Sequence, residues 1–339
     1  MAKGSSDLSA VDAFKQGVVD RLGASIKKAF IDPKNIVYDR FSSGSYLLDD
    51  ELKGGYVKGK HVEFMGESGS GKTSSCAEAV AQFQKKYPKE MIMWFDLENV
   101  LDEDYFNNIG VNIDPDKFIL LRPSTGEEVF EIIREFTKSF KGGLIVIDSV
   151  PLMVPETTME ADFNQANVAA QARLMSKGLE MTMAHVSKSE ATMFFINQLR
   201  VNIGGYGEQN VTKGGKALGY YVRTRIKTSR QNSKGIAGES SGNTFELVKA
   251  NYGNEKKKVE TRIVYGQGID KYSELIDFCT KLDVFEKSGS WFSYKGTKLA
   301  NGKNAFIDVL KDNIELFEEL EQIVRNHIKQ KYEKRNESN

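Results

Sequence analysis

The stretch "HVEFMGESGSGKTSSCAEAVAQFQKKY", residues 61–87, decides the fold. It begins as a short apolar run, continues as the glycine-rich loop "GESGSGKT", and ends with the composition of a helix. Strand, loop and helix in this order carry the signature G-x-x-x-x-G-K-[ST], whose glycines let backbone N–H groups turn toward an anion. A glycine-rich surface turn that matched by accident would lack these flanking elements. We therefore expect the phosphates of a nucleoside triphosphate at the N-terminus of this helix.

Two side chains of this loop have expected roles. Lys72 is expected to reach the β- and γ-phosphates, and the Thr73 hydroxyl to hold Mg²⁺. The predicted nucleotide-binding residues are Gly66, Glu67, Ser68, Gly69, Ser70, Gly71, Lys72, Thr73 and Ser74.

Composition limits the other classes of function. Lys+Arg and Asp+Glu are both 47 in 339 residues, so a polyanion must bind to a local patch rather than to the whole protein. The two cysteines, Cys76 and Cys279, have no paired spacing and the three histidines are scattered, which argues against disulfides and a transition-metal site. No apolar run has the length of a signal peptide core or a membrane span. These features predict a cytoplasmic protein that does not enter membranes.

Outward from the loop, residues 35–268 alternate helical patterns with short apolar runs, which predicts an α/β core. The early runs are almost continuously apolar, as is typical of a mostly parallel sheet covered on both faces, and the later alternating runs predict an antiparallel extension. In chain order the runs are "HVEFM", "MIMWFD", "FILL", "LIVIDS", "TMFFIN", "VRTRIKTS", "NTFELVKA" and "ETRIVYG".

The two ends of the chain have different patterns. Residues 1–34 predict an N-terminal helix that stops before Asp32-Pro33, and residues 269–339 predict a small α+β domain with a polar tail. Apolar residues recur at helical spacing in the first segment, at Val11, Phe14, Val18, Leu22 and Ile26. This stripe needs a surface to cover it, either the main core or a neighbouring subunit, so the segment is a candidate for oligomerisation.

Three strand ends carry candidate catalytic side chains. Asp148 follows "LIVI" and is expected to bind Mg²⁺ with Thr73, although it could also be a helix N-cap. Glu98 and Asp96 both follow "MIMWF", and either could activate water. Asn197 and Gln198 end "TMFFI", where an amide could sense the γ-phosphate. Spacing alone does not choose within these pairs.

Seven segments together resemble the bacterial RecA recombinases in order and approximate spacing. They are "GESGSGKT", "DLENVLDEDY", "VIDSV", "INQLRVNIG", "TKGGKAL", "YGQGID" and "SGSWFSYKG". The resemblance implies a RecA-type P-loop ATPase core that uses ATP and Mg²⁺. It also implies a helical filament on single-stranded DNA that pairs with homologous double-stranded DNA and exchanges strands in DNA repair.

The resemblance also assigns roles to residues. Glu98 matches the family's catalytic glutamate, Gln198 its γ-phosphate-sensing glutamine and Asp148 its Mg²⁺-associated aspartate. Asp102 and Tyr105 match residues that contact the adenine.

The segment after Gln198 is rich in glycine and contains the basic residues Arg200, Lys213 and Lys216. Basic groups bind phosphates and glycines allow close approach, although a purely structural loop could have the same composition. The resemblance identifies this segment, with Gly214 and Gly215, as the second DNA-binding loop. By position alone, residues 155–167 would be the first, despite their acidic character.

The chain departs from the RecA pattern at two places. The family usually has two lysines, one residue apart, that complete the ATP site of the neighbouring subunit; here Lys249 is present and Asn251 takes the second place. Lys256, Lys257 and Lys258 are close by in sequence. The acidic tail common in bacterial RecA is missing, so a divergent or phage-encoded member is one interpretation.

Two rival functions share the same loop and sheet. A hexameric helicase or motor of the RecA fold would form closed rings rather than filaments. A filament scaffold that binds ATP and activates the self-cleavage of a repressor would not need catalysis, and the presence of Glu98 argues against an inactive ATPase.

Overall fold

The computed structural model describes residues 9–33, 36–161, 169–201, 210–212, 216–231 and 239–337. The chain divides into two compact units, Met1–Asp39 and Arg40–Asn339.

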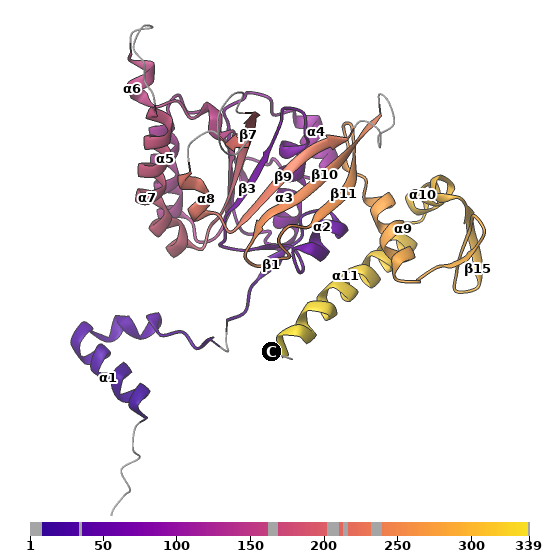
Figure 1. Cartoon of the computed structure of the whole chain (residues 1–339), viewed down its shortest axis with the longest axis horizontal. Helices are drawn as coiled ribbons and strands as arrows, with labels where there is room; N and C mark the ends of the chain where they lie inside the picture. Colours follow the sequence, from indigo (N-terminus) through magenta and orange to yellow (C-terminus); the bar gives the residue numbers. More distant parts are fainter. Residues whose placement is uncertain are drawn as a thin grey trace, which may run out of the picture. The chain divides into compact units, whose positions relative to one another are not determined.

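A large sheet forms the centre of the second unit, with the strand order β12-β11-β10-β9-β3-β7-β6-β4-β5 (Figure 1). Six neighbouring strands are parallel: β3 (Val62–Gly66), β4 (Ile92–Asp96), β5 (Phe118–Leu121), β6 (Leu144–Asp148), β7 (Thr192–Val201) and β9 (Thr224–Gln231). The antiparallel strands are β10 (Ser240–Ala250), β11 (Lys258–Val264) and β12 (Gly268–Ile269), and β8 (Asn210–Thr212) pairs antiparallel with β7. The expected α/β class is confirmed.

The antiparallel extension begins later than its sequence pattern predicted. The run "VRTRIKTS" alternates, and we expected it to be antiparallel, but β9 pairs in parallel with β3. Alternation reports that one face of a strand is more exposed than the other, as the burial pattern of β9 shows, and it carries no information on strand direction. Antiparallel pairing starts at β10.

Helices cover both faces of the sheet, because successive strand residues point to opposite sides. In β4, Ile92 and Trp94 pack into the apolar cluster beneath α3, whereas Met93 and Phe95 pack into the cluster beneath α5 and α7. The helices of this unit before the C-terminal domain are α2 (Tyr46–Glu51), α3 (Lys72–Lys86), α4 (Glu103–Ile109), α5 (Gly126–Ser139), α6 (Glu156–Met159), α7 (Ala170–Ser189) and α8 (Ala217–Tyr221). The antiparallel pair β1 (Arg40–Phe41) and β2 (Tyr56–Val57), which flank α2 in the chain, and the 3₁₀ turn η3 (Val150–Leu152) complete it.

The C-terminal domain forms a separate apolar cluster, which includes Leu275, Phe278, Phe306 and Leu320 and is joined by Tyr46 of α2. Its elements are α9 (Lys271–Lys281), β13 (Glu286–Ser288), β14 (Trp291–Tyr294), β15 (Thr297–Asn301), α10 (Lys303–Asp312) and α11 (Ile314–Glu337). The helical ending of the sequence is two helices, because Asn313 ends α10 and its side chain accepts a hydrogen bond from the Leu316 N–H at 3.0 Å. The α+β character expected for this region is therefore present.

The first unit contains α1 (Ala10–Leu22) and the 3₁₀ turn η1 (Ala24–Ala29). The sequence predicts one helix that stops before Asp32-Pro33, but the α-helix ends earlier, at Leu22. Gly23 has a φ of 87°, a conformation that ends helices and that other residues rarely adopt. Within residues 9–33, α1 has no buried residue, and Val11, Phe14 and Leu22 are exposed.

Both cysteines are fully buried thiols, Cys76 in the first cluster and Cys279 in the C-terminal core. Among the helices that the structure describes, none combines the length and apolar character needed to cross a membrane.

Candidate nucleotide site

The phosphate loop connects β3 to α3, and side chains of β9 and β10 hold it in place. Gly71 adopts the left-handed conformation that starts α3, with a φ of 85°. The Ser70 hydroxyl lies 2.7 Å from the Thr228 hydroxyl of β9, and its carbonyl accepts from Asn243 Nδ2 of β10 at 2.9 Å. At Gly66 a Cβ would lie 2.3 Å from the Thr228 carbonyl oxygen, so only glycine fits there. The loop shape is therefore set by the sheet.

Lys72 is the first residue of α3, and its ammonium points back over the loop. Its Nζ donates to the carbonyl of Gly66 at 3.1 Å and to that of Glu67 at 2.6 Å. Burial lowers the pKa of Lys72, and the carboxylates of Glu98, Asp148 and Glu67 oppose this shift. Its present partners are neutral carbonyls, which an anion can replace.

Thr73 and Asp148 meet at the end of β6. The Thr73 hydroxyl donates to Asp148 Oδ2 at 3.0 Å, while Oδ1 is buried and has no hydrogen-bond partner in the part of the chain that the structure describes. Burial, together with the charges of Glu98 and Asp96, raises the pKa of Asp148 to about 7. Asp148 is thus a carboxylate at the end of a strand, and one of its oxygens has no hydrogen-bond partner in the described structure.

Glu98 and Gln198 lie together at the ends of β4 and β7. Glu98 Oε1 accepts from the Ser149 hydroxyl at 2.6 Å and from Gln198 Nε2 at 3.4 Å. Asp96, the rival carboxylate, is bound elsewhere: it accepts from the Val100 N–H at 3.1 Å and from Arg122 Nη2 at 2.7 Å. Of the two candidate carboxylates, Glu98 lines the nucleotide pocket and Asp96 secures the loop after β4.

The second candidate amide, Asn197, is bound inside the sheet. Asn197 is fully buried, and its Nδ2 donates to Glu63 Oε1 of β3 at 2.9 Å. Arg225 Nε donates to the other oxygen of Glu63 at 2.6 Å. Asn197 therefore ties neighbouring strands together, and Gln198 is the amide at the pocket.

Tyr105 and Asp102 lie at the start of α4, near Ser74 at the end of the phosphate loop. The Tyr105 hydroxyl donates to Ser74 Oγ at 2.5 Å, and its side chain lines the pocket. Asp102 is the N-cap of α4, and its carboxylate accepts from the Tyr105 N–H at 2.7 Å. Asp102 is exposed, and its cap bond to the Tyr105 N–H positions the start of α4.

The pocket has a volume of about 300 Å³ and gathers most of the predicted residues. Its wall consists of Ser68, Gly69, Ser70, Gly71, Lys72, Thr73, Ser74, Glu98, Tyr105, Asp148, Ile196, Gln198, Ser241, Ile263, Tyr265 and Gly266. The sequence predicted no role for five of them, Ile196, Ser241, Ile263, Tyr265 and Gly266, although the last two belong to the recognised segment "YGQGID". A larger cavity of about 550 Å³ lies between α5 and α7, and its wall includes Pro155 and Thr157 of the expected first DNA-binding loop.

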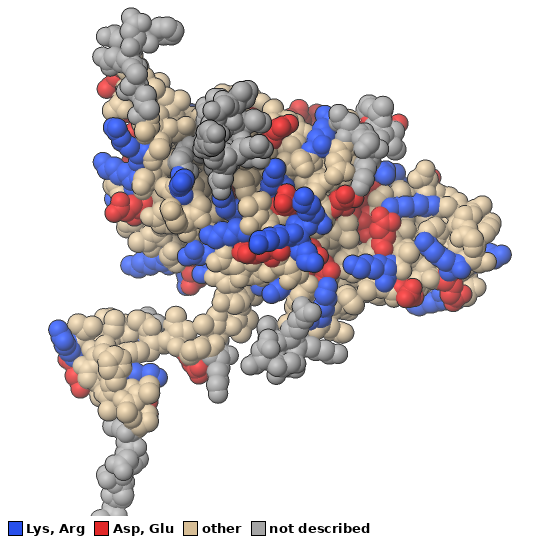
Figure 2. All heavy atoms as spheres, in the orientation of Figure 1, with Lys and Arg blue, Asp and Glu red and all other residues tan. Residues whose placement is uncertain are grey.

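Lys249 lies in β10, outside the wall of this pocket. Its Nζ donates to the carbonyls of Gly219 at 2.9 Å and Val222 at 2.8 Å, at the end of α8. Burial and the neighbouring Arg223 and Arg225 lower its pKa. Figure 2 shows basic side chains gathered over the strands that lie in front in Figure 1. Asn251 is exposed.

Few of the predicted DNA-binding residues are described. Arg200 belongs to β7, the strand that carries Gln198, and Lys216 is an exposed residue just before α8. Lys213, Gly214 and Gly215 lie outside the described residues, as do 162–167 of the expected first loop.

Comparison with known proteins identifies the family. The model of the RecA N-terminal domain matches residues 10–270, and that of the RecA C-terminal domain matches residues 273–329. The chain belongs to the RecA family. Protein RecA of Campylobacter hominis is 36% identical over 329 residues, which cover 94% of this chain and 90% of the relative. Protein RecA of Mycoplasmopsis pulmonis is 36% identical over 83% of each chain, and that of Rickettsia bellii 37% over 86% of this chain and 85% of the relative.

Family membership confirms the main reading of the sequence. The protein is a RecA-type recombinase and a DNA-dependent P-loop ATPase that binds nucleotide, binds DNA and forms oligomers. The ring-forming motor and the inactive scaffold are not favoured.

Proposed function

We propose that this RecA protein binds ATP with Mg²⁺ in the pocket above the phosphate loop, and that hydrolysis there controls a helical filament on single-stranded DNA. The filament pairs with homologous double-stranded DNA and exchanges strands. One observation carries the proposal: Lys72, the Thr73–Asp148 pair and the Glu98–Gln198 pair converge on a single pocket. We place this work in the cytoplasm, where its DNA partners would be.

The loop residues Gly66 to Ser74 bind the phosphates in this proposal. Backbone N–H groups at the start of α3 and the helix dipole favour negative charge there. Lys72 exchanges its two carbonyl partners for phosphate oxygens, a stronger charge-assisted bond. Tyr105, on α4, lies at the adenine side, with Asp102 beside it.

Thr73 and Asp148 fit Mg²⁺, which prefers oxygen ligands. The open Oδ1 of Asp148 supports this assignment, since a buried carboxylate oxygen is costly without a partner. When bound, the ion would neutralise phosphate charge. A nearby cation also favours the ionised form of a carboxyl whose pKa is about 7 in its absence.

Glu98 is the general base in this proposal, because it lies in the pocket with an exposed edge and is held by Ser149. Gln198 senses the γ-phosphate. A shift of Gln198 is transmitted through β7 to the DNA-binding segment that follows this strand. Arg200, Lys213, Gly214, Gly215 and Lys216 bind the phosphate backbone of DNA there.

Lys249 acts on the neighbouring subunit's nucleotide. In its own subunit the ammonium binds the end of α8, away from the pocket. A cation supplied across a subunit contact stabilises phosphate charge only after assembly, as an arginine finger does. Catalysis would then belong to the filament rather than to the subunit.

Mixed filaments test these roles together. Glu98→Gln and Lys249→Ala should each lower DNA-dependent ATP turnover by about 100-fold or more, the range for loss of a general base or a trans-acting cation. Mixing the two variants should restore part of the turnover, because some contacts join an intact Glu98 site to an intact Lys249.

The mixture must be shown by electron microscopy to form helical filaments that contain both variants. No recovery at any mixing ratio would mean that Lys249 acts within its own subunit or not at all. Closed rings instead of filaments would contradict the proposed helical assembly on DNA.

A further inference from the structure

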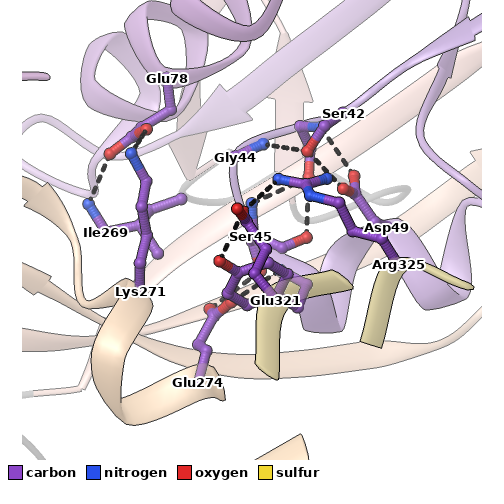
Figure 3. A network of polar contacts seen from close by, with 12 residues as sticks. Ser42, Gly44, Ser45, Asp49, Glu78, Ile269, Lys271, Glu274, Glu321 and Arg325 are labelled. Carbon is purple, nitrogen blue, oxygen red and sulfur yellow. Dashed lines mark hydrogen bonds and ion pairs between the residues drawn. The ribbon is translucent and has the colours of Figure 1, made fainter. Parts of the chain in front are cut away.

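Helix α3 carries, besides the phosphate-binding residues, a fully buried carboxylate, Glu78. Its Oε1 accepts from the Ile269 N–H at 2.9 Å, and its Oε2 lies 2.8 Å from Lys271 Nζ (Figure 3). A buried carboxylate is tolerated only when it is hydrogen-bonded and paired, and removal of one partner is strongly destabilising. Both partners come from the end of the large sheet and the start of the C-terminal domain.

Two glycines make the space for this carboxylate. A Cβ on Gly268 would lie 2.4 Å from Glu78 Oε1, and one on Gly44 would lie 2.9 Å from Oε2. Both have positive φ, 86° and 91°, which favours glycine. Two chain segments therefore close around Glu78 in a way that larger residues would prevent.

The segment held by Glu78 leads directly to the nucleotide pocket. Ile269 pairs with Ile263 across β12 and β11. Ile263, Tyr265 and Gly266 line the pocket opposite the phosphate loop. A Cβ on Gly71 would lie 2.4 Å from Ile263 Cδ1, so this side chain is packed against the loop itself. We call the Glu78–Lys271 pair, with its bond to the Ile269 N–H, the clamp. Only the pairing of β12 with β11 separates the clamp from the pocket wall.

The cation of the clamp belongs to the C-terminal domain. Lys271 is the first residue of α9, and Glu274 in the same helix accepts from Ser45 Oγ and from the Tyr46 N–H, both at 2.9 Å (Figure 3). These bonds fix the start of α9 against α2. The position of Lys271 is therefore set by the attachment of α9 to α2.

We propose that Glu78 and Lys271 are positioning residues for nucleotide binding: their buried charge pair holds Ile269, and through the β11–β12 pairing it keeps the Ile263–Gly266 wall against the phosphate loop. The C-terminal domain then contributes to nucleotide affinity without touching the nucleotide. This inference rests on the proposed nucleotide pocket.

Fluorescent ADP binding by the full chain tests the clamp. Lys271→Met removes the ammonium beside Glu78, whose pKa burial already raises, so the carboxyl must either stay buried without a cation or take up a proton. We expect about tenfold weaker binding, within the usual range of coupling between linked sites. Glu78→Gln added to Lys271→Met should restore wild-type affinity, because the amide still accepts from the Ile269 N–H and carries no charge. This rescue would not occur if Lys271 only added contact area.

Two controls separate the clamp from other causes. Lys331→Met breaks a different ion pair of the C-terminal domain, in which Lys331 Nζ lies 2.6 Å from Asp50 Oδ1 on α2. It should bind ADP as the wild type does, even if its melting temperature falls. Lys72→Ala should lose binding, which verifies the pocket independently.

Wild-type binding by folded Lys271→Met, alongside loss in Lys72→Ala, would overturn the clamp and leave the pocket intact. Normal binding by Lys72→Ala would instead overturn the pocket. In the wild-type protein, ADP should also slow hydrogen exchange of the Ile269 amide, and an unchanged rate would contradict the proposal without any variant.

Discussion

The two ends of this chain bury their apolar side chains to very different extents. The C-terminal domain buries Phe278, Phe306 and Leu320 in an apolar core that also includes Tyr46 of α2. Helix α1, at the other end, has an apolar stripe of similar spacing but no buried residue within the described residues 9–33. The comparison teaches that helical periodicity shows which face of a helix is apolar, whereas the identity of the surface that covers it depends on the rest of the fold or on another molecule.

Phe306→Ala should have the largest effect on subunit stability. Phe306 is fully buried, with ring centroids 5.0 Å from Phe285 and 5.2 Å from Phe292. The cavity left behind should lower the free energy of unfolding of the C-terminal domain by about 3–5 kcal/mol, as measured by urea unfolding. A loss below 1 kcal/mol, on the scale of surface substitutions, would show that this core is not tightly packed.

The attachment of that domain should weaken as pH rises. Burial raises the pKa of Glu274 to about 7, from an ordinary value of 4.5, so the folded protein favours the protonated form. The stabilisation from this proton is complete below pH 4.5 and is lost as pH rises to about 7. We expect the free energy of unfolding to fall by up to about 3 kcal/mol over this range.

Glu274→Gln isolates this contribution, because an amide does not titrate. The variant should lose the contribution of Glu274 but keep that of Asp148, whose pKa burial also raises to about 7, so its fall in stability between pH 5 and pH 8, measured by urea unfolding, should be clearly smaller than that of the wild type. Equal slopes in both proteins would assign the pH dependence to other groups.

Phe14→Ala should have the smallest effect on the subunit and act instead on assembly. Phe14 is 66% exposed, so unfolding of the subunit should change by less than about 0.5 kcal/mol. If a neighbouring subunit covers it, assembly should lose about 1.5–3 kcal/mol per contact, and DNA-dependent ATPase activity should need at least about tenfold more protein.

Gln16→Ala, on the opposite side of α1, is the matched control, since its side chain bonds only the exposed Asp20 in the described structure. An equal loss of activity in both variants would show that the stripe has no special role.

The central part of the fold was readable from sequence because its signals are local. The phosphate loop, the apolar strands and the carboxylates at their ends are each specified by neighbouring residues, and the parallel topology then brings Thr73, Glu98 and Asp148 together. Spacing alone did not separate Glu98 from Asp96; the family resemblance selected Glu98, and the structure shows that the two side chains have different partners.

The parts that sequence did not reveal depend on pairing between distant segments. Tyr265 reaches the pocket only because β10 and β11 pair beside β9, nearly two hundred residues after the phosphate loop. The role of Asp102 as an N-cap and the end of α1 at Gly23 are backbone effects that compete with a simple reading of residue type. The domain boundaries at residues 34 and 268 stay predictions.

The burial of both native cysteines makes the protein suited to site-specific labelling. Only a thiolate reacts readily with maleimide or iodoacetamide, and burial raises the pKa of the Cys76 thiol and brings that of Cys279 to about 12. Neither sulfur is exposed in the folded chain. A cysteine placed at exposed Lys298, on β15, would therefore take up a dye alone, and the C-terminal domain could be followed by fluorescence with both natural thiols kept.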